Sequence, residues 1–181
     1  MIIGITGHTS GIGKGLYDFY RNLGHTVTGF SRSNGYDLST EEAINKVATY
    51  AVKNCEVFFN KAYADMAQVK LMYKIHPFWE NNLDKTHVVV GSRAGDFLHN
   101  KPQYYAVAKS AIDDAAEQLR PLGKYHLVNI KPSWVNTPML PARFTEDDPT
   151  ISIDDLIEFI NFIVTHKSMR IVNATIEPIA K

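Results

Sequence analysis

The sequence has little cysteine, no excess of charge and no long apolar run. A single cysteine, Cys55, excludes an intramolecular disulfide and a cysteine-based zinc site. Lys and Arg together number 19, as do Asp and Glu, so the formal net charge is zero. A dedicated nucleic-acid-binding protein usually carries a basic excess. No apolar run approaches the roughly 18 residues of a membrane span. We therefore expect neither nucleic acid nor a membrane as a partner.

The length and composition are those of a globular protein. At about 150 residues per domain, 181 residues predict one domain over 1–181. The chain is 45% hydrophobic and 21% charged, which argues against disorder. No basic segment precedes its first apolar run, unlike in a signal peptide, so we expect a cytoplasmic protein. Its seven histidines lack ligand-like spacing, and we predict no metal site.

Short apolar runs alternate with helical patterns along the chain. Their residues predict strands at 2–6, 26–30, 56–60, 87–91, 125–130 and 169–176. Helices are expected between them at 12–22, 39–53, 64–79, 103–119 and 152–165, with Ser39 in a capping box and a break near Pro77. Strands alternating with helices predict an α/β fold with a doubly wound parallel sheet. In such sheets ligands bind at the carboxyl ends of the strands.

A glycine-rich turn follows the first strand and opens the first helix. Its residues are Thr6-Gly7-His8-Thr9-Ser10-Gly11-Ile12-Gly13, with the spacing G-x-x-x-G-x-G. Glycine permits a sharp turn and lets a phosphate approach the backbone, and the amides of a helix N-terminus favour a pyrophosphate. The alternative is a glycine turn without a ligand, but its place between strand and helix favours a dinucleotide. The spacing differs from that of a P-loop.

Several motifs in order resemble the short-chain dehydrogenase/reductase family. After the glycine turn come Asn60-Lys61-Ala62-Tyr63, similar to N-N-A-G; Gly91-Ser92, at the end of a buried strand; Tyr105-Ala106-Val107-Ala108-Lys109, matching Y-x-x-x-K; and Pro132-Ser133-Trp134-Val135-Asn136-Thr137, similar to P-G-x-x-x-T. The resemblance covers nearly the whole chain. It implies a Rossmann-type fold in three α/β/α layers, an oxidoreductase with a nicotinamide cofactor, and a homodimer or homotetramer.

Ser92, Tyr105 and Lys109 are the predicted catalytic residues. Tyr105 and Lys109 are four residues apart on a predicted helix and share a face. Reduction of a carbonyl needs a proton donor at its oxygen while hydride arrives at its carbon. We expect Tyr105 to be that acid, with Lys109 favouring the phenolate and Ser92 orienting the carbonyl. A tyrosine and a lysine at this spacing are otherwise an ordinary surface pair.

The resemblance also implies an asparagine on the helix before Ser92, holding a water for proton relay. The matching segment, residues 68–71, has no asparagine, so Lys70 or another residue takes that place. Ser133 stands where the family usually has glycine. These two departures, together with the short segment after Thr137, support an alternative function, a non-catalytic NADP(H)-binding sensor or regulatory protein. The presence of Ser92, Tyr105 and Lys109 argues against that alternative.

The end of the second strand predicts which dinucleotide binds. An acidic residue there would favour NAD, but the segment is Phe30-Ser31-Arg32-Ser33. Arg32 can bind a 2′-phosphate through charge-assisted bonds, so we expect NADP(H); a solvated loop arginine is the alternative. The remaining expected cofactor contacts follow the family's motifs: Gly7, Ser10, Gly11, Ile12, Gly13, Ser31, Ser33, Asp37, Leu38, Asn60, Ala62, Tyr105, Lys109, Pro132, Val135 and Thr137.

The chain is shorter than the family's common members, which have about 250 residues, and most of the shortage follows Thr137. We expect Phe97, Trp134 and Met139 to line a pocket for a small carbonyl or alcohol substrate, with core packing as the alternative. No G-x-S-x-G elbow of a serine hydrolase is present. The sequence thus predicts an NADP(H)-dependent oxidoreductase of a carbonyl/alcohol pair.

Overall fold

A six-stranded parallel sheet forms the centre of the computed structural model, which describes residues 1–97, 101–166 and 168–179. The strand order is β2-β1-β3-β4-β5-β6. The bounds are β1 Ile2–Thr6, β2 Thr26–Phe30, β3 Val57–Asn60, β4 Thr86–Val90, β5 His126–Pro132 and β6 Asn173–Ile176. The predicted doubly wound α/β fold is confirmed.

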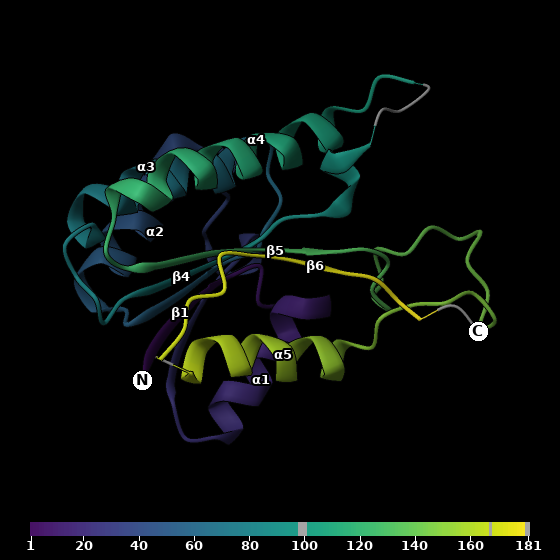
Figure 1. Cartoon of the computed structure of the whole chain (residues 1–181), viewed down its shortest axis with the longest axis horizontal. Coiled ribbons are helices and arrows are strands. Elements are labelled where there is room, and N and C mark those ends of the chain that lie inside the picture. Colours follow the sequence, from purple (N-terminus) through teal and green to yellow (C-terminus); the bar gives the residue numbers. More distant parts are fainter. Residues whose placement is uncertain (98–100, 167, 180–181) are drawn as a thin grey trace.

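Helices cover both faces of this sheet (Figure 1). α1 (Gly11–Asn22) and α5 (Ile153–Thr165) pack together on one face. α2 (Glu41–Asn54), α3 (Ala67–Trp79) and α4 (Tyr104–Leu119) cover the other. Two apolar clusters fill the layers, one on each side of the sheet. Because both faces are covered, β3 and β4 are buried along their whole length, including the polar residues Asn60, Thr86 and His87.

Three local predictions differ from the structure. Thr40, not Ser39, caps α2, and its hydroxyl accepts a hydrogen bond from the Ala43 amide at 3.3 Å. Pro77 lies inside the last turn of α3, and the helix continues past it to Trp79 rather than breaking there. The last strand begins at Asn173 rather than Met169, where its pairing with β5 begins.

The chain reverses its direction of winding between β1 and β3, which lie side by side at the centre of the sheet. The carboxyl ends of the strands meet at one edge. At that edge the start of α4 faces the long segment that joins β5 to α5 (Figure 1). The switch point of such a sheet is where ligands bind. No helix in the described part of the chain is long and apolar enough to span a membrane.

Candidate active site

A cavity of about 510 Å³ opens at the carboxyl ends of β4 and β5. It collects side chains from five separate segments of the chain. Among its lining residues are the three predicted catalytic residues, Ser92, Tyr105 and Lys109. Phe97, Trp134 and Met139 also line it, as predicted from the sequence. The other lining residues are Ile12, Lys61, Tyr63, Val90, Gly91, Arg93, Ala94, Gln103, Pro132, Ser133, Val135, Thr137, Leu140 and Arg143.

The first turns of α4 hold Tyr105 and Lys109 on the side that faces the cavity. Lys109 Nζ lies 5.6 Å from the centroid of the Tyr105 ring. The Tyr63 ring packs edge-on against Tyr105, with centroids 4.9 Å apart. Tyr104, its neighbour, is 58% exposed and is absent from the cavity wall. Helical spacing thus directs one of two adjacent phenols into the site.

Ser92 follows β4 and begins a short 3-10 turn, Arg93–Asp96. Its hydroxyl oxygen accepts a hydrogen bond from the Ala94 amide at 3.1 Å. Because the backbone supplies a donor to this oxygen, the hydroxyl proton is free to be donated into the cavity. Ser92 is therefore suited to bind an oxygen acceptor such as a carbonyl.

The Lys109 ammonium is held by neutral acceptors in a buried position. The residue is 3% exposed. Its Nζ donates to Gln68 Oε1 at 2.7 Å and to the carbonyl oxygen of Val90 at 3.0 Å. A lysine ammonium has three donors, so one is left for a ligand. Burial, and to a lesser extent the charge of Lys61, lowers the pKa of Lys109 to about 7.

Gln68, in the first turn of α3, is a site residue that sequence reasoning did not identify. It is buried, and its Nε2 donates to the carbonyl oxygens of Asn60, at 2.7 Å, and Val90, at 3.1 Å. Its Oε1 is thereby aimed at Lys109. Lys70 instead lies on the exposed side of α3 and pairs with Glu41 at 3.0 Å. Within residues 68–71, Gln68 rather than Lys70 is therefore the side chain that faces Lys109.

The glycine turn has the close backbone packing that a phosphate site requires. Gly7 has φ +71°, in the left-handed region that favours glycine. A Cβ at Gly13 would clash with the Gly7 carbonyl oxygen, so only glycine fits. Gly11, with Ile12, opens α1, Ser10 is its N-cap, and no Ser10 side-chain bond closes the helix end. Free amides and a Cβ-free cradle suit a dinucleotide's diphosphate.

The turn is tied to the end of β3 by the buried Thr6 hydroxyl. Its Oγ1 accepts hydrogen bonds from the Lys61 amide at 2.8 Å and the Ala62 amide at 3.0 Å. Ala62 lies against Gly7. Asn60, a predicted cofactor contact, is instead fully buried and is not in the cavity wall; its Nδ2 donates to the Gln68 backbone oxygen at 2.9 Å. Asn60 therefore positions Gln68.

The segment predicted to recognise the 2′-phosphate begins at Ser31, after β2. The Ser31 amide donates to Asn34 Oδ1 at 2.8 Å, and Asn34 Nδ2 donates to the Gly29 carbonyl at 2.8 Å. The Ser31 and Ser33 hydroxyl oxygens lie 2.8 Å apart, and Arg32 is exposed. Asp37 is also exposed, and hydrogen bonds from Ser39 lower the pKa of its carboxyl. Leu38 is buried in the core rather than at a ligand surface.

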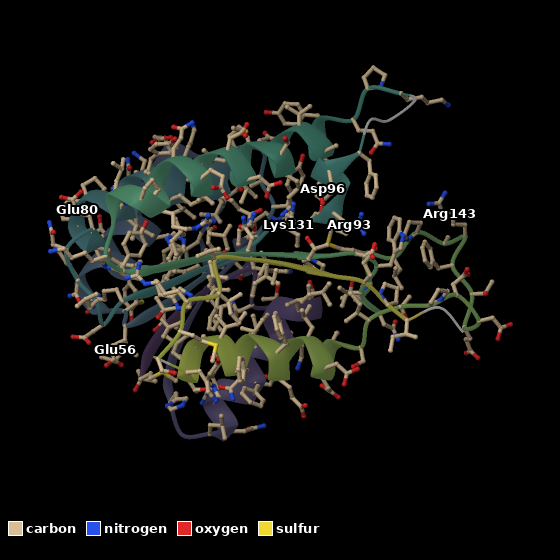
Figure 2. The ribbon with its side chains drawn as sticks, in the orientation of Figure 1. Glu56, Glu80, Arg93, Asp96, Lys131 and Arg143 are labelled. Carbon is tan, nitrogen blue, oxygen red and sulfur yellow. The ribbon has the colours of Figure 1, made fainter. Side chains whose placement is uncertain are left out.

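The far wall of the cavity comes from the segment after β5. Pro132, Val135 and Thr137 contribute its inner part. Further out, the Trp134 and Phe144 rings pack at 4.7 Å, and the Arg143 guanidinium lies 5.8 Å from each ring centroid. Figure 2 places Arg143 on this segment, with Arg93, Asp96 and Lys131 nearer the sheet. Arg93 pairs with Glu177, and Lys131 pairs with Asp96 at 2.6 Å.

Comparisons with known proteins support the fold. No protein-family model matches the sequence, and no curated protein does either. Among solved structures, the 3-alpha-hydroxysteroid dehydrogenase from Pseudomonas sp., complexed with NADH, is 18% identical with a TM-score of 0.77, covering 98% of this chain and 95% of that one.

Two further structures are similar over nearly the whole chain. The 3-ketoacyl-(acyl-carrier-protein) reductase from Brucella melitensis, complexed with NADH, has a TM-score of 0.74 at 19% identity, covering 97% of this chain and 96% of that one. A short-chain dehydrogenase from Burkholderia cenocepacia, in complex with NADP, has a TM-score of 0.75 at 15% identity, covering 96% and 86%. This chain therefore has the fold of the short-chain dehydrogenases, as its motifs predict.

Proposed function

We propose that this protein is an NADP(H)-dependent oxidoreductase that interconverts a carbonyl compound and an alcohol. The observation that carries this proposal is the presence of Ser92, Tyr105 and Lys109 in the wall of one cavity. The glycine turn beside it, formed by Gly7 to Gly13, fits a dinucleotide's diphosphate. The similar structures that contain NADH or NADP add support.

The bound dinucleotide would supply hydride to the substrate carbon, and the chain's own groups supply the proton. In reduction, the Tyr105 hydroxyl donates its proton to the carbonyl oxygen, leaving a phenolate. The Lys109 ammonium stabilises that phenolate through its charge, and its remaining N–H donor would hold a ribose hydroxyl of the dinucleotide. The Ser92 hydroxyl donates a hydrogen bond to the same carbonyl oxygen and orients it. The phenolate regains a proton from solvent, and oxidation runs the same steps in reverse.

The preference for NADP(H) rests on the segment after β2. Arg32 is exposed there, and Ser31 and Ser33 place two hydroxyls beside it. No carboxylate stands among residues 31–34 to repel a 2′-phosphate. Arginine binds phosphate through several charge-assisted bonds. NADPH should accordingly bind more tightly than NADH.

Two measurements test this function. Thermal unfolding with NADPH and NADH in parallel should show stabilisation, about 2.7 kcal/mol at a hundred times the dissociation constant. NADPH oxidation is then followed with a panel of ketones and aldehydes for the wild type, Tyr105→Phe and the matched control Tyr104→Phe. We expect only Tyr105→Phe to lose turnover while still binding NADPH. NADPH binding without any turnover would favour the sensor, and no binding would reject both functions.

A further inference from the structure

Lys61 is a charged residue of the cavity wall to which the proposed reaction assigns no role. It follows the end of β3, where the N-N-A-G motif that this segment resembles has an asparagine. Its side-chain stem packs near Gly7 of the glycine turn. Its amide is fixed by the Thr6 hydroxyl at 2.8 Å. The backbone and stem of Lys61 are therefore held between the glycine turn and the catalytic residues.

The Lys61 ammonium lacks a counter-ion. No hydrogen bond or ion pair joins its Nζ to any residue in 1–97, 101–166 or 168–179. Burial lowers the pKa of this half-buried group, and its charge acts on Lys109. A partly desolvated charge without a partner is costly to a folded protein. A charge of this kind in a cavity wall marks a candidate position for binding an anionic ligand.

The cavity as a whole is lined by basic rather than acidic side chains. Four basic residues line it, and no Asp or Glu from the described ranges does. The Arg93 guanidinium is already paired with Glu177. The Lys109 ammonium has only the neutral oxygens of Gln68 and Val90 as acceptors. The amines of Lys61 and Lys109 therefore share this cavity wall with no carboxylate from the described ranges.

We propose that Lys61 binds the diphosphate group of the dinucleotide and thereby helps to neutralise the positive charge around Lys109. This inference rests on the proposed function, because the dinucleotide is the anion concerned. The glycine turn offers only backbone amides to the diphosphate, and Lys61 adds a full charge beside them. A charged donor forms a stronger hydrogen bond to phosphate than a neutral one.

Binding should also take up protons. The groups that face Lys109 are Lys61, Gln68, Tyr105 and the Val90 carbonyl, and none of them is a carboxylate. An anion nearby favours the charged form of an amine. At about pH 8 the free protein would hold Lys109 largely neutral, and the diphosphate would recharge it.

The test is calorimetric titration of NADPH into the wild type, Lys61→Met and the surface control Lys70→Met. Methionine keeps the apolar stem and removes only the charge. We expect Lys61→Met to weaken NADPH binding about tenfold, with less proton uptake when buffers of different ionisation enthalpy are compared. Lys70→Met should match the wild type, because Lys70 is exposed and paired with Glu41.

Thermal unfolding without ligand separates a binding role from a structural one. Removing an unpaired charge should leave the melting temperature of Lys61→Met equal to or above that of the wild type. A lower melting temperature, or unchanged NADPH affinity and proton uptake, would overturn the role of Lys61 while leaving the oxidoreductase proposal intact. A wild type that does not bind NADPH at all would overturn both.

Discussion

The buried ammonium of Lys109 predicts an unusual dependence of stability on pH. Burial lowers the pKa of this group from 10.5 to about 7 in the folded protein. Between these two values the unfolded chain binds more protons than the folded one, so stability rises with pH. The stabilisation is complete above the unfolded pKa and is lost as the pH falls through the folded pKa.

The size of this pH dependence follows from the one proton that Lys109 binds in the unfolded chain and lacks in the folded protein. The slope is about 1.4 kcal/mol per pH unit where the unfolded chain is protonated and the folded one is not. From about pH 7.5 to about pH 9 this amounts to about 2 kcal/mol of unfolding free energy. Burial raises the pKa values of Tyr20, Tyr125 and Cys55, which gives slopes of opposite sign at higher pH. The effect of Lys109 is therefore measured as the difference in unfolding free energy between the wild type and a variant that lacks this lysine.

Urea unfolding at several pH values measures that difference. The wild type is compared with Lys109→Met and with Lys53→Met, which removes an exposed lysine of α2. We expect the unfolding free energy of the wild type minus that of Lys109→Met to rise by about 2 kcal/mol from about pH 7.5 to about pH 9. The same difference for Lys53→Met should not change with pH. A flat difference for Lys109→Met would show that its ammonium is solvated, and the account of the catalytic lysine would be refuted.

Three other substitutions test separate parts of the site. Gly13→Ala should destabilise the protein by about 1–3 kcal/mol in urea unfolding, because its Cβ would clash with the Gly7 carbonyl oxygen; an unchanged midpoint would show that the turn can adapt. Gln68→Leu should lower the unfolding free energy by roughly 2–4 kcal/mol in the same urea experiment, since it removes the acceptor for Lys109 and two buried donors. An unfolding free energy equal to that of the wild type would contradict the hydrogen bonds of Gln68 with Lys109, Asn60 and Val90. Arg32→Ala should weaken NADPH binding about tenfold and leave NADH binding unchanged in calorimetry; equal losses for both would reject its contact with the 2′-phosphate.

The sequence predicts the fold well because its signals are local and repeated. Apolar runs and helical periodicity place, in order, the six strands and five α-helices found in the described part of the chain, and the glycine spacing marks the turn at the switch point. Cap assignment fails by one residue at Thr40, because Ser39 and Thr40 are chemically equivalent N-caps. Only the backbone path decides between them.

The side-chain network of the site is harder to predict. Gln68 contacts Lys109 because α3 starts at Ala67 and points this residue inward, which no local pattern specifies. Asn60 belongs to a recognisable motif, yet the end of a fully buried strand turns its amide toward α3. Both facts depend on contacts between segments eight or more residues apart. A motif identified as a unit does not show which of its members face the ligand.

The most direct test of the central claim is a crystal structure of the protein with NADP⁺. We expect the diphosphate to contact the amides at the start of α1, and the nicotinamide to lie beside the Tyr105 hydroxyl with its ribose within hydrogen-bond distance of Lys109 Nζ. A dinucleotide bound elsewhere, or a nicotinamide out of reach of Tyr105, would contradict the proposed reaction.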